Sequence, residues 1–134
     1  MEKIKVMLDT SAYSAFLRGN AEVTQALREA DEIYLNPVVL GELYAGFARG
    51  GKNRKNRDIL REFVASPRVQ IAVIDEETAE RYMSIITFLW SNGTPIPTND
   101  LWIAATAMQY GLKLITTDGH YRNVPQIIVE SCNV

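Results

Sequence analysis

Short apolar runs alternate with amphipathic segments along the chain. The apolar runs have the length of strands and predict strands at 4–8, 32–36, 69–74, 112–117 and, as a fifth candidate, 126–130. The amphipathic segments keep a helical spacing and predict helices at 11–19, 21–31, 37–48, 57–66, 75–90 and 98–111. A polar, basic stretch at 50–57 is typical of a connection. Strands that alternate with helices predict an α/β fold with a mostly parallel sheet of four or five strands.

Several residues mark the ends and faces of the predicted helices. Asn36 followed by Pro37 is typical of an N-cap and a first helical position. The last predicted helix has Thr98 or Asn99 as its expected N-cap. In the helix at 75–90, the spacing of large apolar side chains predicts a core face that includes Tyr82, Met83, Ile86 and Trp90.

Composition limits the class of protein. The 134 residues are 47% hydrophobic, which predicts one domain, 1–134, with a core of its own. One cysteine, Cys132, excludes both a disulfide within the chain and a zinc cluster of cysteines. A net charge of −2 argues against a strongly basic nucleic-acid binder, although local charge matters more than the sum. The sequence has no signal-peptide core or membrane span, so we expect a cytoplasmic protein with no membrane partner.

Four carboxylates stand at positions where elements meet. Asp9 follows the first predicted strand and Asp118 the fourth, and ligands bind beyond the carboxyl ends of parallel strands. Glu42 shares a helix face with apolar residues, so it needs a cation or a hydrogen-bond donor. Asp100 opens the last helix. Each acid alone has an ordinary explanation, as a turn residue, a favourable charge at a helix start or a buried salt bridge. Together they predict an oxygen-only site for Mg²⁺ or Mn²⁺.

Four motifs resemble those of the PIN-domain ribonucleases, in particular the VapC toxins of toxin–antitoxin pairs. They are MLDTSAY (7–13), NPVVLGELYAG (36–46), GTPIPTNDLWIAATAMQYG (93–111) and LITTDGHY (114–121). The resemblance implies a three-layer α/β/α domain and a metal-dependent endoribonuclease. It assigns the catalytic and metal-binding positions to Asp9, Glu42, Asp100 and Asp118, and the supporting polar positions to Thr10, Ser11 and Thr116. One or two Mg²⁺ ions would neutralise phosphate oxygens and activate water.

The same resemblance implies partners and shows one departure. Such toxins form homodimers, and a VapB-like antitoxin blocks them by placing a segment in the acidic groove. The family often carries another acid two residues after the position of Asp118, where this chain has His120. We expect His120 to be an ordinary surface histidine, with a role in holding water or RNA as the alternative.

The expected RNA contacts come from a basic cluster. Five cations follow Glu42 within nine residues, and they are suited to phosphate contacts: Arg49, Lys52, Arg54, Lys55 and Arg57. The alternative is a solvated loop. Tyr13 and Tyr121 either stack on bases or pack in the protein.

Other functions remain open from the residues alone. A phospho-acceptor domain also places acids at strand ends and binds Mg²⁺. An aspartyl phosphatase needs a second Asp where this chain has Ser11, and a receiver would use Asp75, after the third strand. Neither class explains Glu42. A PIN nuclease of ordinary RNA processing and a non-catalytic binding module are the further alternatives.

Overall fold

The computed structural model describes residues 2–134 and contains one five-stranded sheet. All the strand pairs are parallel, and the order is β3-β2-β1-β4-β5. The strands are β1 (Lys5–Leu8), β2 (Glu32–Leu35), β3 (Val69–Ile71), β4 (Lys113–Thr116) and β5 (Ile128–Ser131). The predicted parallel sheet is therefore confirmed, and the fifth candidate strand belongs to it.

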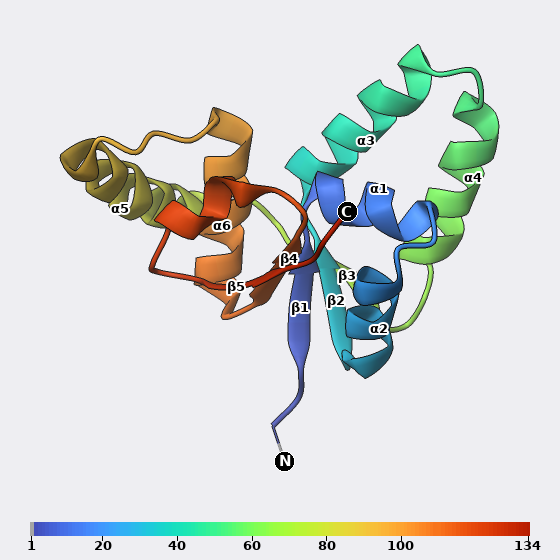
Figure 1. Ribbon diagram of the computed structural model, residues 1–134, viewed down its shortest axis with the longest axis horizontal. Coiled ribbons are helices and arrows are strands. Elements are labelled where there is room, and N and C mark those ends of the chain that lie inside the picture. Colours follow the sequence, from blue (N-terminus) through green and yellow to red (C-terminus); the bar gives the residue numbers. More distant parts are fainter. Residues whose placement is uncertain (1) are drawn as a thin grey trace.

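Helices cover both faces of this sheet (Figure 1). They are α1 (Thr10–Leu17), α2 (Ala21–Glu29), α3 (Pro37–Arg49), α4 (Asn53–Val64), α5 (Glu76–Asn92), α6 (Thr98–Tyr110) and the short 3₁₀ helix η1 (Gly119–Asn123). Helices α5 and α6 lie on one side of the sheet, and α1, α2 and α4 lie on the other. The chain adds β2 and β3 on one side of β1 and then returns to add β4 and β5 on the other side. Because the crossovers are right-handed, the helices before and after this return cover opposite faces of the sheet. The three-layer α/β/α prediction is confirmed. None of the helices described for residues 2–134 has the length and apolar character needed to cross a membrane.

The core lies around β1, the central strand. Val6, Met7 and Leu8 are completely buried, and Leu8 pairs with Ile115 of β4. A strand that is buried on both faces carries no alternation of polar residues, which explains the continuous apolar run in the sequence. The strand is therefore a rigid support that places the next residue, Asp9, at the carboxyl end of the sheet.

The helix boundaries correct two of the predictions and confirm a third. Residues 53–57 form the first turn and a half of α4 and are not part of a connection. Arg, Lys and Asn are tolerated at exposed helical positions, so α4 begins several residues before its first apolar side chain. Helix α6 begins at Thr98, after Pro97 at the N-cap position, so neither Thr98 nor Asn99 is the N-cap. The Asn36 cap is confirmed, since its side chain accepts from the N–H of Val39.

The predicted core face of α5 is wrong in part. Trp90 is 66% exposed and Met83 is 50% exposed. The buried residues of this helix are Thr78, Ile85 and Leu89, which are seven and four positions apart and therefore share one face. Met83 and Trp90 lie about 120° to 140° around the helix from the centre of that face, so the helix turns them toward solvent.

Candidate active site

The acidic side chains meet where the strand order reverses. Strands β1 and β4 are neighbours there, while the chain continues from each to opposite edges of the sheet. Asp9 follows β1 and is the N-cap of α1, and Asp118 follows β4 and is the N-cap of η1. Asp100, in the first turn of α6, approaches the same place. This is the crevice in which open α/β sheets bind ligands, so the predicted position of Asp9 and Asp118 is confirmed.

Asp9 is held by four hydrogen bonds. Its Oδ1 accepts from the N–H of Ala12 and from Ser11 Oγ, both at 2.8 Å. Its Oδ2 accepts from Thr116 Oγ1 at 2.6 Å and from Ser11 Oγ at 3.0 Å. The residue is only 3% exposed, and burial raises the pKa of its carboxyl, as does the nearby charge of Asp100. The two hydroxyls therefore fix the direction of the carboxylate without neutralising it.

Glu42 has two hydrogen-bond donors as partners and no described cation. Thr10 Oγ1 donates to Oε1 at 2.5 Å, and Asn99 Nδ2 donates to Oε2 at 3.2 Å. Glu42 lies on α3, Thr10 on α1 and Asn99 on α6, so this carboxylate joins three helices. The sequence indicated that Glu42 needs a partner, and the partner is a pair of neutral donors. Neutral donors thus hold the Glu42 carboxylate at the junction of these three helices.

Asp100, Asp118 and His120 form the tightest cluster. His120 Nδ1 lies 2.8 Å from Asp100 Oδ2 and 3.1 Å from Asp118 Oδ1. Burial raises the pKa of Asp100, and the charge of Asp118 raises it further against the opposing hydrogen bond from His120. The hydrogen bond to Asp100 raises the pKa of the His120 imidazole. One potential ligand atom from each of the three residues lies within 4.8 Å of the others, so these residues can share one cation.

The buried phenol of Tyr121 lies next to this cluster. Tyr121 is 1% exposed, and its hydroxyl has no hydrogen-bond partner of good geometry among residues 2–134. Burial, together with the charges of Asp9, Asp100 and Asp118, raises the pKa of this phenol. Tyr13 is also fully buried, where it packs against Phe16 and Phe63. Stacking of either tyrosine on RNA bases is therefore excluded.

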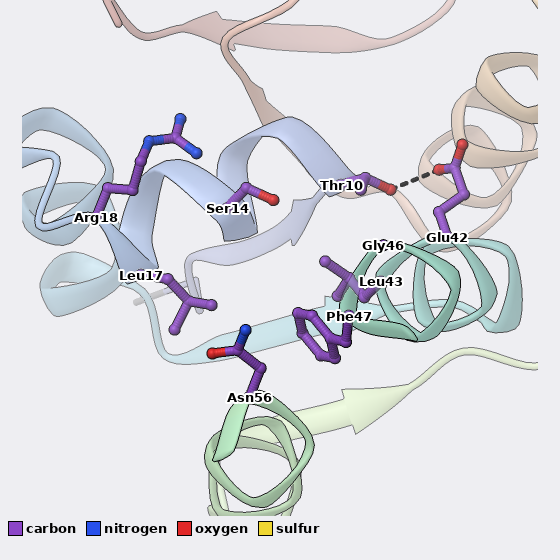
Figure 2. Close-up of a pocket in the computed structure, with 9 residues that line it drawn as sticks. All are labelled: Thr10, Ser14, Leu17, Arg18, Glu42, Leu43, Gly46, Phe47 and Asn56. Atoms are coloured by element: carbon purple, nitrogen blue, oxygen red, sulfur yellow. Dashed lines mark hydrogen bonds between the residues drawn. The ribbon is translucent and has the colours of Figure 1, made fainter. Parts of the chain in front are cut away.

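A groove of about 480 Å³ leads away from the acids between α1, α3 and α4. Figure 2 shows the hydrogen-bonded pair of Thr10 and Glu42 at one end, with Arg18 and Asn56 toward the other. Phe47 and Leu43 form part of its wall. The five cations of the basic cluster are exposed on the arm that α3 and α4 build, with Arg57 stacked on Tyr44 at 4.5 Å. They belong neither to the acidic cluster nor to the lining of this groove, and Arg57 lines a separate pocket with Leu40 and Tyr44.

Several residues that complete the site do not stand out in the sequence pattern. The sequence predicts Asn99 only as a helix cap, and Tyr121 only as a base-stacking or packing residue. The position of Asn99 next to Asp100, at the start of an amphipathic helix, was the available signal. Nothing in the sequence pattern pointed to Arg18 or Asn56, because they meet only when α1 and α4 pack together.

The geometry excludes the receiver among the alternatives. Receivers use the strand order 2-1-3-4-5, whereas the order here is 3-2-1-4-5. Asp75, the candidate phospho-acceptor, is instead the N-cap of α5 and accepts from Thr78 and Gln109. Its carboxylate therefore has a structural role in capping a helix.

The pKa of His120 leads to a prediction about stability and pH. A histidine whose pKa is raised in the folded state contributes stability that is present below about pH 6.5 and is lost as the pH rises through the folded value. We therefore expect the melting temperature in EDTA to fall more steeply from pH 6 to pH 8 for the wild type than for His120→Gln. The pair is half exposed, so the difference should be about 2 °C by scanning calorimetry. Parallel curves would contradict the prediction.

Comparisons with known proteins agree with this geometry. The family model of the PIN domain matches residues 6–127. A ribonuclease VapC from Rickettsia bellii is 33% identical over 92% of this chain and 93% of its own length. Ribonuclease VapC4 from Mycobacterium tuberculosis is 30% identical over 69% of this chain and 71% of its own length. The crystal structure of VapBC2 from Rickettsia felis bound to a promoter DNA fragment contains a chain with TM-score 0.83 and 25% identity, covering 96% of this chain and 98% of that one.

Proposed function

Because this chain belongs to the PIN domain family, we propose that it is a metal-dependent endoribonuclease and the toxin of a VapBC-type toxin–antitoxin pair. The observation that carries the proposal is the gathering of Asp9, Asp100 and Asp118 at the point where the strand order reverses. Three neighbouring carboxylates with little positive charge nearby lower the free energy of unfolding, because their charges repel and are partly buried. A bound cation offsets this destabilisation. We further propose that residues 1–134 are a single nuclease domain.

The donor set suits a divalent metal that prefers oxygen. Asp9, Asp100 and Asp118 would hold it, with Glu42 at the edge of the site, and the buried hydroxyl of Tyr121 adds a polar group with unmet hydrogen bonding. When bound, such an ion neutralises charge on the phosphate and lowers the pKa of water. This assignment of ligands follows the family resemblance and is supported by the raised pKa values of Asp9 and Asp100.

The neutral residues of the site keep the carboxylates in place. Ser11 and Thr116 fix the direction of Asp9, and the N–H of Asp118 donates to Thr116 Oγ1 at 2.9 Å. Thr116 thereby links the two acids that follow β1 and β4. Thr10 and Asn99 hold Glu42 at the entrance of the groove. Such restraints matter for catalysis because a reacting group displaced by 1 Å loses most of its effect.

RNA would enter along the groove between α1, α3 and α4. A groove that begins at an acidic site and ends beside exposed cations suits a strand that is held by its phosphates and cut at the acids. Lys52, Arg54 and Lys55 lie at the start of α4, where cations oppose the helix dipole. Their position costs helix stability, which supports a role in binding an anionic ligand.

The partner protein is proposed from the relatives. The similar structure from Rickettsia felis is a VapBC complex, and we propose that a VapB-like antitoxin covers the acidic groove of this chain. An arginine of such a partner would form paired hydrogen bonds with a carboxylate of the site. The homodimer and the cytoplasmic location stay predictions.

Cleavage of labelled RNA tests the function. We expect cleavage with Mg²⁺ or Mn²⁺ and none in EDTA, and we expect Asp100→Asn to lower the rate at least about 10²-fold, since it removes one charge from the metal site. Cleavage that persists in EDTA, or an unaffected Asp100→Asn variant, would contradict the metal mechanism.

The toxin assignment has a separate readout. Induced expression should arrest growth, and Asp100→Asn should relieve the arrest. RNA cleavage without growth arrest would assign the chain to ordinary RNA processing. Folded protein that cuts none of a broad set of RNAs would favour a binding module.

A further inference from the structure

We propose that His120 supplies a nitrogen ligand to the metal site and that this ligand makes the site prefer Mn²⁺ to Mg²⁺. The inference rests on the proposed metal site and goes beyond it by naming a ligand that the four acids do not include. The chain has one histidine, so every property of an imidazole in this protein belongs to His120.

The segment after β4 folds His120 back toward Asp118. Asp118 is the N-cap of η1, and its Oδ1 accepts from the N–H of His120 at 2.9 Å. This short turn places the imidazole over two carboxylates from different elements, Asp118 after β4 and Asp100 on α6. The turn therefore brings the imidazole within reach of both carboxylates, and its contacts with them hold the ring in place.

The distances in the cluster match those between neighbouring metal ligands. Two adjacent ligands of an octahedral ion with bonds of about 2.1 Å lie about 3 Å apart. His120 Nδ1 lies 2.8 Å from Asp100 Oδ2 and 3.1 Å from Asp118 Oδ1. The imidazole nitrogen and both carboxylate oxygens can thus occupy positions around one ion with small shifts.

A second observation at the same place is the orphaned hydroxyl of Tyr121. This phenol is 1% exposed and lacks a partner of good geometry within the described residues. Burial raises its pKa, and so do the nearby carboxylates, of which Asp100 is close enough for a weak hydrogen bond. A buried hydroxyl without a partner is costly, so it indicates a group or a rearranged carboxylate that the site acquires when occupied. Tyr121 follows His120 directly, and the two side chains approach Asp100 together.

Nitrogen ligation changes the choice of metal. Mg²⁺ prefers oxygen ligands and rarely accepts imidazole, whereas first-row transition metals accept imidazole readily. An acid in place of His120 would complete an all-oxygen set that suits Mg²⁺ well. The histidine in this chain therefore shifts the balance toward Mn²⁺.

Electron paramagnetic resonance with Mn²⁺ alone tests the assignment without RNA or activity. In the wild type we expect the spin-echo signal of bound Mn²⁺ to show coupling to an imidazole ¹⁴N nucleus. The coupling should vanish in both His120→Asp and His120→Gln. The ratio of Mn²⁺ to Mg²⁺ affinity, measured by competition, should fall about tenfold in His120→Asp. Arg122→Ala, an exposed change in the same 3₁₀ helix, is the matched control and should keep both the coupling and the ratio.

The outcomes separate this inference from the proposed function. Mn²⁺ that binds without ¹⁴N coupling, and with the same selectivity in His120→Asp, would show that His120 only pairs with Asp100 and Asp118; the inference then fails and the metal site stands. Wild-type protein that binds neither ion would overturn the metal site of the proposed function, and this inference with it. Circular dichroism of each variant confirms that the fold is kept.

Discussion

Replacing Asp9 by Asn is expected to lower RNA cleavage about 10³-fold while raising the melting temperature of the metal-free protein. The two effects have one cause. Asp9 is 3% exposed, and burial raises the pKa of its carboxyl, so the ionised form is held at a cost in the folded state. The charge is needed only when a cation is bound.

Asparagine keeps the local structure of this position. Its side-chain oxygen can still accept from the N–H of Ala12, so the cap of α1 is retained. Its amide can donate to the hydroxyls of Ser11 and Thr116, which are able to accept. We therefore expect a gain of about 1 kcal/mol, typical of a single stabilising substitution, which is a few degrees in melting temperature.

Scanning calorimetry in EDTA and single-turnover cleavage measure the two effects. Glu80→Gln removes a carboxylate that is exposed on α5 and is the matched control; it should change neither quantity. A lower melting temperature for Asp9→Asn would show that the charge stabilises the fold, as an ordinary helix cap does. In that case the buried carboxylate would need no cation to explain it.

The sequence predicted the place of the acids because that place depends on local rules. A buried strand, its last residue and the next helix are neighbours in the chain, and the carboxyl ends of parallel strands lie at one edge of the sheet. Asp9 and Asp118 follow from this reasoning, and Asp100 follows from the start of α6. Glu42 follows from a different rule, because a carboxylate on an apolar helix face needs a partner, and no local rule connects its place in α3 with the strand ends.

The rest depended on packing between distant segments. Asn99 becomes a partner of Glu42 only because α6 meets α3, and Tyr121 is buried only because η1 packs against α6 and β5. The exposure of Trp90 depends on which face of α5 packs against α6, and apolar spacing alone left more than one face available. Sequence patterns describe one helix or strand at a time, so they do not predict these contacts between distant segments.

The buried carboxylates that the proposed function needs lower the stability of the folded protein while no cation is bound. Burial raises the pKa values of both Asp9 and Asp100, and the neighbouring carboxylate adds to each shift. Hydroxyl and amide groups donate hydrogen bonds to these carboxylates and fix their orientation. Because these donors are neutral, the negative charge of the carboxylates stays available to a ligand. His120 is the one cationic group that the described structure pairs with these acids. Under the proposal above, its role as an ion-pair partner or as a metal ligand would decide which metal the site prefers.

Neutralising the start of α4 is expected to weaken RNA binding about 10²-fold at low salt. The change is the triple variant Lys52→Ala, Arg54→Ala and Lys55→Ala, placed in the Asp100→Asn background so that the RNA stays intact. These side chains are exposed, and they stand at the end of α4 where the helix dipole is already positive. Their removal should therefore leave the melting temperature unchanged or raise it slightly, although it weakens binding.

The salt dependence of binding identifies phosphate contacts directly. Each contact to single-stranded RNA contributes about 0.7 to the slope of log affinity against log salt, so the triple variant should lower the slope by about 2. The matched control removes three exposed cations from the opposite end of the molecule, through Lys3→Ala, Lys5→Ala and Arg28→Ala, and should keep the slope. Equal loss in both variants would mean that net charge alone attracts the RNA. An unchanged slope in the α4 variant would place the RNA elsewhere, because a strand held by these cations cannot lose them without releasing fewer counterions.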